Sequence, residues 1–174
     1  MDGLRRYTIF GIIFVLLMGT LAHFVYDWTG RSHIVGYFVP VNESVWEHMK
    51  LVFFPMLLYA VFIIAKCKNN CQCIISSLCA GILSGTAFIP ILFYAYTSIL
   101  GKNYLILDIG VFIISTLVAF WVFYRLEISC NRKSVYKLFF CGLTAVLFIC
   151  FMAFTYHPPQ NTIFEDPTVS QKSE

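Results

Sequence analysis

Charged residues are scarce in this chain of 174 residues: Asp, Glu, Lys and Arg make up 12% of it, where an ordinary globular domain has about 25%. Hydrophobic residues make up 59% and aromatic residues 18%. A soluble domain of this length has too small an interior to bury so much apolar side chain. The composition therefore excludes a soluble domain and a disordered chain, and it predicts a membrane protein. The net charge of +3 does not indicate a nucleic-acid partner.

Short catalytic motifs are also lacking. The chain contains no HExxH, no GxSxG and no P-loop, the patterns typical of zinc proteases, serine hydrolases and nucleotide-binding proteins. The polar linkers are short, so they leave no room for a separate soluble domain. Any chemistry must therefore come from polar residues within or beside the apolar segments.

Five apolar runs are long enough to cross a bilayer, which needs about 20 residues with almost no charge. Backbone groups in hydrocarbon must be satisfied within their own segment, so the runs are predicted to be helices. The fold class expected is all-α, a polytopic bundle of five spanning helices over residues 1–156, followed by a polar extracytoplasmic tail over 157–174. A shorter apolar stretch at 33–41 is interpreted as an interfacial or re-entrant piece. The predicted spans are 7–26, 45–65, 74–100, 104–124 and 136–156.

The distribution of Lys and Arg predicts the orientation in the membrane, because loops rich in these residues stay in the cytoplasm. Five crossings put two-thirds of them on the side of the N-terminus: Arg5, Arg6, Lys66, Lys68, Arg125, Arg132, Lys133 and Lys137, against Arg31, Lys50, Lys102 and Lys172. We therefore expect a multi-pass plasma-membrane protein with its N-terminus inside and its C-terminus outside. A cleaved signal peptide is the alternative for the first run.

Ionisable side chains gather on the predicted outer side. They are His23, His33, His48, His157, Asp27, Glu43, Glu47 and Asp108. Such groups are costly in a membrane segment and usually face the protein interior, where they mark binding sites or ion pathways. Gly19, His23 and Asp27 are spaced by four residues and so share one helix face. The clustering predicts a polar site that opens on the external face.

The segment Pro40–Lys50 admits a purely structural interpretation. Ser44 and Glu47 have the spacing of a capping box that opens a helix, Trp46 suits an interfacial anchor, and Lys50 suits a charge that snorkels to the headgroups. This interpretation does not explain Glu43 or His48. At least one ionisable residue of the segment is therefore expected to belong to the site.

Imidazoles combined with carboxylates suit zinc or another divalent metal. His23, His48 and His157 come from three different predicted helices and are the candidate metal ligands, leaving a position for an activated water. Glu47 is the candidate catalytic base. The remaining candidates, as ligand-binding residues, are Asp27, Asn42, Glu43, Asp108 and Tyr156.

Three functions remain open on the sequence. The first is binding or transport of a cation or a small polar ligand at the outer face. The second is a metal-dependent membrane hydrolase that acts at the outer leaflet. The third is a non-catalytic interaction subunit. The expected partners are the lipid bilayer and an unidentified small ligand or ion; the oligomeric state is left open.

The run PVNESVWEHMKLVFFP at 40–55, with His23 and Tyr26 upstream, resembles an uncharacterised family of small multi-pass bacterial membrane proteins. The resemblance continues in the tail, around Tyr156 and from Phe164 to Pro167, and covers nearly the whole chain. It implies a fold and a membrane localisation and brings no activity with it.

Overall fold

The computed structural model describes residues 2–66, 73–129 and 134–167. Within these ranges the chain forms six α-helices and one short 3₁₀ helix, with no strand. The elements are α1 (Asp2–Trp28), α2 (His33–Gly36), α3 (Val45–Lys66), α4 (Ile74–Leu100), α5 (Leu105–Ile128), α6 (Ser134–Phe154) and η1 (Thr162–Phe164). The expected all-helical class is thus confirmed.

Five of the helices, α1, α3, α4, α5 and α6, are long and apolar enough to cross a membrane. Each overlaps one of the five predicted runs: α1 begins five residues before its run, at Asp2, whereas α4 spans the predicted 74–100. Helix α5 continues past the predicted span at 104–124, through Arg125 to Ile128, with Glu127 buried. The short stretch after α1 forms the single turn α2 rather than a further long helix.

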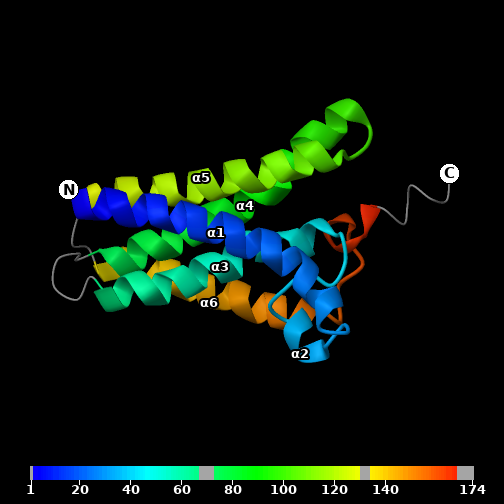
Figure 1. The fold of residues 1–174 in the computed structure, drawn as a ribbon, viewed down its shortest axis with the longest axis horizontal. Helices are drawn as coiled ribbons and strands as arrows, with labels where there is room; N and C mark the ends of the chain where they lie inside the picture. Colours follow the sequence, from blue (N-terminus) through cyan, green and yellow to red (C-terminus); the bar gives the residue numbers. More distant parts are fainter. Residues whose placement is uncertain (1, 67–72, 130–133, 168–174) are drawn as a thin grey trace.

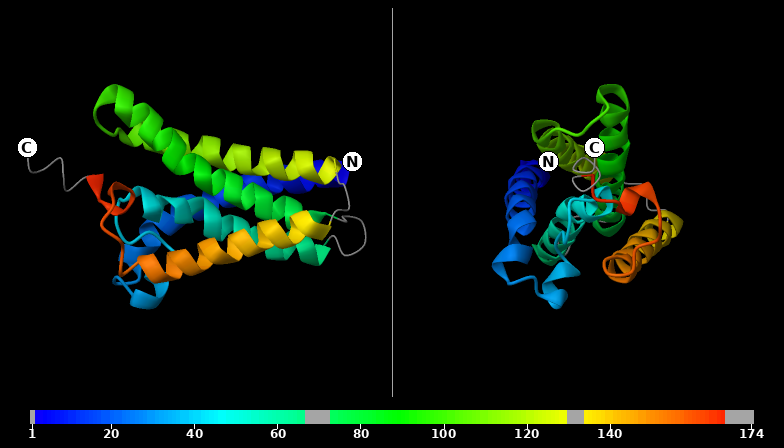
Figure 2. Two further views of the ribbon diagram at one scale, coloured as in Figure 1. Left: turned by 180° about the vertical axis from the view of Figure 1, so that it is seen from behind. Right: turned by 90° about the vertical axis from the view of Figure 1, so that its right-hand side faces the viewer.

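The long helices form an elongated bundle with α3 and α4 at its centre (Figure 1). Helix α4 packs against α3, α5 and α6, and α1 packs against α3 and α5. The end-on view in Figure 2 places α1 and α6 on opposite sides of the bundle. We call the end where α1 finishes, α3 begins and α6 finishes the histidine end; the N-terminus lies at the other end (Figure 1).

The contact between α1 and α3 depends on Gly19. A Cβ at this position would lie 2.6 Å from the carbonyl oxygen of Leu51, so only glycine permits the approach. Pro55 lies inside α3, and a helical proline leaves the carbonyl four residues earlier without its helical partner. The freed Leu51 carbonyl therefore faces the glycine of α1. This contact holds α1 and α3 together at a point about one helical turn from His23 and His48.

Two expectations for the start of α3 are wrong. Lys50 does not snorkel to a headgroup region: it is 0% exposed inside the bundle. Trp46 is not an interfacial anchor either, because it is 8% exposed and its ring packs on Phe151 of α6 and Phe164 of η1. Both side chains point inward because α6 and the segment after it fold back over the start of α3.

Candidate metal site

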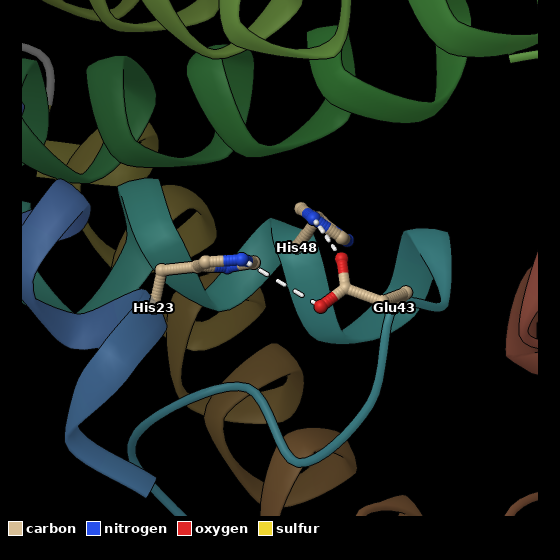
Figure 3. Close-up of side chains that lie close together, drawn as sticks. All are labelled: His23, Glu43 and His48. Atoms are coloured by element: carbon tan, nitrogen blue, oxygen red, sulfur yellow. Dashed lines mark ion pairs between the residues drawn. The ribbon is translucent and has the colours of Figure 1, made fainter. Parts of the chain in front are cut away.

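Three side chains meet at the histidine end, each from a different part of the chain. His23 lies on the last turns of α1, His48 on the first turn of α3, and Glu43 on the connection that precedes α3 (Figure 3). The His23 Nε2 atom lies 3.6 Å from Glu43 Oε1, and the His48 Nε2 atom lies 3.4 Å from Glu43 Oε2. All three residues can offer ligand atoms within 4.8 Å of one another.

A backbone hydrogen bond orients the His48 ring. Its Nδ1 atom lies 2.9 Å from the Ser44 carbonyl oxygen, and because a carbonyl only accepts, Nδ1 carries the proton. In the neutral ring the lone pair is then on Nε2, which faces the Glu43 carboxylate. A metal-bound histidine commonly donates its other N–H to a backbone carbonyl in this way.

A lone pair that faces a carboxylate is repulsive unless a positive charge lies between them. A second proton on His48 or a bound cation would supply it. Ligand atoms of one small metal ion lie within a few ångströms of one another. One ligand atom from each of the three residues lies within 4.8 Å of the other two, and the Glu43 carboxylate turns one oxygen toward each histidine.

A small cavity of about 40 Å³ adjoins the cluster and has room for a few water molecules. Glu43 and His48 line one part of it, and Asp108 and Asn103 line another. The remaining wall is apolar and includes Phe93 of α4 together with residues of α3 and α5. The Asp108 carboxylate accepts hydrogen bonds from the Tyr96 hydroxyl and from the Asn103 amide. A group bound at the cluster would thus share this cavity with a second carboxylate.

Among the predicted residues that lie outside the cluster are Asp27, His157 and Asn42. Asp27 is exposed and pairs with Arg31 at 3.1 Å, not with His23. His157 is exposed just after α6 and does not belong to the group that could hold a metal among the described residues. The Asn42 side chain accepts a hydrogen bond from the Ser44 amide at 2.9 Å, which is a local turn.

Tyr156 also lies outside the cluster and makes other contacts. Its hydroxyl donates to the His33 carbonyl oxygen at 2.8 Å, and its ring packs on those of His33 and Tyr37. Burial raises the pKa of Tyr156 above its ordinary value, and the neighbouring Tyr26 adds to the shift. This tyrosine therefore stays neutral and secures the segment around α2.

Glu47 is 2% exposed and lies outside the cluster. Only half of the expected capping box forms: the Glu47 amide donates to Ser44 Oγ at 3.3 Å. The Glu47 carboxylate is held instead by Lys50 Nζ at 2.7 Å and by the Val41 amide at 3.0 Å. Sequence reasoning missed this partner, although a lysine within an apolar helix was itself a signal.

These features define the class of the protein: an all-helical chain with five helices that could cross a membrane and a histidine–glutamate cluster at one end. A model of a family of unknown function (DUF6512) matches residues 1–173, so the chain belongs to that family. This confirms the resemblance to an uncharacterised family. No curated protein and no solved structure matches the chain significantly.

Proposed function

We propose that the protein is a multi-pass plasma-membrane protein that binds a divalent metal cation through His23, Glu43 and His48 at its extracytoplasmic face. The five long apolar helices support the membrane location. The excess of Lys and Arg in the connections at the end opposite the cluster supports the orientation. The cation would reach the site from outside the cell.

One observation carries this proposal: His48 Nε2 lies 3.4 Å from the Glu43 carboxylate, while His48 Nδ1 is already hydrogen-bonded to a backbone carbonyl. Two imidazoles and one carboxylate suit zinc and the neighbouring first-row metals rather than magnesium or calcium. Three protein ligands leave a fourth position, as in sites where a metal binds water or an exchangeable ligand. Reversible binding of a cation, as in a transporter or a sensor, fits this open arrangement.

A metal-dependent hydrolase is the second candidate, and the cavity beside the cluster favours it. Asp108 and Asn103 line this cavity together with Glu43 and His48. A water in the fourth position would be acidified by the metal, and a carboxylate in the same cavity could take its proton. Asp108 suits this role better than Glu47, because Asp108 lines the cavity, whereas the Glu47 carboxylate binds Lys50 away from it.

Zinc binding to the full chain, purified in detergent without metal, tests the proposal. We expect about one equivalent to bind, and His48→Ala or His23→Ala to weaken binding at least about tenfold. His157→Ala is the matched control, since this histidine lies at the same end but outside the cluster. Failure of the unaltered protein to bind zinc, cobalt or manganese would overturn the proposal and favour an interaction subunit. An equal loss in the control would overturn the assignment of ligands.

Two further assays separate the candidates. Uptake of the bound metal into proteoliposomes would indicate transport. Hydrolysis of lipid esters or amides that requires both the metal and Asp108 would indicate an enzyme.

A further inference from the structure

A buried ion pair lies beside the cluster, at the start of α3. Lys50 Nζ donates to Glu47 Oε2 at 2.7 Å, to Thr155 Oγ1 at 2.7 Å and to the Gly36 carbonyl oxygen at 3.0 Å. An ammonium group has three protons, so these three contacts satisfy it completely. The pair thereby joins α3 to the end of α2 and to the segment that follows α6.

The same pair holds the last residue of α2 and the connection to α3, together residues 36–44, at two points. Lys50 binds the carbonyl of Gly36 at its start, and Glu47 Oε2 accepts from the amide of Val41. Glu43 comes two residues after Val41, so the position of its carboxylate follows from the position of this backbone. The connection has no long helix of its own, and Glu43 is the one member of the cluster that it carries.

Because the pair is buried, it restricts the position of the 36–44 connection closely. A charged group removed from water is strongly destabilising unless it is paired and fully hydrogen-bonded. Any displacement of the 36–44 connection would break the bonds to Gly36 and Val41 and would leave part of the buried pair unsatisfied. The two histidines need no such anchor, because they lie on α1 and α3, which pack directly against each other.

We propose that the Glu47–Lys50 pair is the positioning element of the metal site: it holds the 36–44 connection so that Glu43 completes the set of ligands. The inference rests on the proposed metal binding. It assigns Glu47 a role through Glu43 instead of contact with the bound group. It also gives separate roles to two glutamates four residues apart, one just before α3 and one in its first turn.

A double-mutant cycle for zinc affinity tests this role. Lys50→Met alone leaves a buried carboxylate without its partner and can prevent folding, so the pair is removed with E47Q/K50M, which leaves no charge. In the unaltered protein we expect Glu43→Gln to weaken zinc binding by about 10- to 100-fold. In the E47Q/K50M protein the affinity is already low, and Glu43→Gln should weaken it less than about threefold. The connection that carries Glu43 has then lost its bond to Lys50 at Gly36 and keeps only weaker bonds, at Val41 and from the Glu43 amide to Asp166.

The matched control is Tyr59→Phe, farther along α3, which removes a hydroxyl that donates to the Tyr7 carbonyl of α1. This variant lowers stability without touching the connection, and Glu43→Gln should keep its full effect there. Equal effects of Glu43→Gln with and without the pair would overturn the inference, as would zinc affinity in E47Q/K50M equal to that of the unaltered protein. If the unaltered protein binds no metal, the proposed metal binding itself is wrong. If it binds metal but Glu43→Gln has equal effects with and without the pair, only the positioning role is wrong.

Discussion

Glu43 and Glu47 are four residues apart, yet they belong to opposite environments. The Glu43 side chain is 46% exposed and faces two histidines that approach no closer than 3.4 Å. The Glu47 side chain is 3% exposed and contacts Lys50 at 2.7 Å. The Glu47–Lys50 pair is closed, because its hydrogen bonds are all made within the chain. The His23–Glu43–His48 cluster is open, because its carboxylate has no lysine or arginine partner among the described residues. A carboxylate that is paired with a lysine therefore stabilises the fold, and one that is not paired in this way can bind an external cation.

The largest effect is expected from breaking the closed pair. Lys50→Met should lower the free energy of unfolding by about 3–5 kcal/mol, because it leaves the Glu47 carboxylate buried without a counter-charge. In the absence of metal, Glu43→Gln should change it by no more than about 0.5 kcal/mol, since that carboxylate is half-exposed. Denaturant unfolding of the two variants in detergent compares them directly. Equal losses would show that the two carboxylates do not differ as described.

The next effect concerns the helix contact that brings the two histidines together. Gly19→Ala places a methyl group against the Leu51 carbonyl and should lower stability by about 1–3 kcal/mol through overpacking. It should also weaken zinc binding, because the added methyl group would push α1 away from α3 and would move His23 away from His48. Gly110→Ala is the control, since a Cβ there meets nothing within 4 Å. Similar losses in both variants, in thermal unfolding or in zinc affinity, would contradict the role of Gly19.

Acidification should affect the open cluster. Imidazole and carboxylate ligands must lose their protons before they bind a metal, so zinc affinity should fall by on the order of tenfold or more from neutral to mildly acidic pH. Titration calorimetry at the two pH values measures this, and circular dichroism controls for unfolding. A zinc affinity that does not change with pH would exclude histidine ligands.

The smallest effect is expected at Asp27. Its pair with Arg31 is exposed, and such pairs contribute about 0–1 kcal/mol. Asp27→Asn should therefore leave zinc affinity unchanged and stability within about 0.5 kcal/mol of the unaltered protein. A clear loss of zinc affinity would place Asp27 in the site, as the sequence had suggested, and would revise the set of ligands.

The long helices could be predicted from the sequence because the length and apolarity of a run do not depend on what packs against it. The run at 74–100 became α4 with the same bounds. The predicted span at 104–124 stops before Arg125, because charged residues usually end an apolar run. Glu127 instead continues the helix and is buried in the bundle, a placement that depends on neighbouring helices.

The site could be predicted only in part, for a related reason. The one-sided gathering of ionisable residues predicted that His23, Glu43 and His48 lie near one end of the bundle, where the structure brings them together. It could not separate these from His157, because the distance from the end of α6 to the other histidines depends on how the helices pack. The ion pair between Glu47 and Lys50 was not predicted, because capping and snorkelling are local patterns, whereas Lys50 binds Gly36 and Thr155, distant in the chain.

The sequence alone determined that this chain forms long apolar helices and that its imidazoles and carboxylates concentrate near one end. Both properties follow from composition along single segments, where hydrocarbon length and charge are sufficient. Only the tertiary structure decided which carboxylate is closed by a lysine and which faces two histidines. That choice depends on distances of a few ångströms between segments remote in the chain, and packing alone sets such distances.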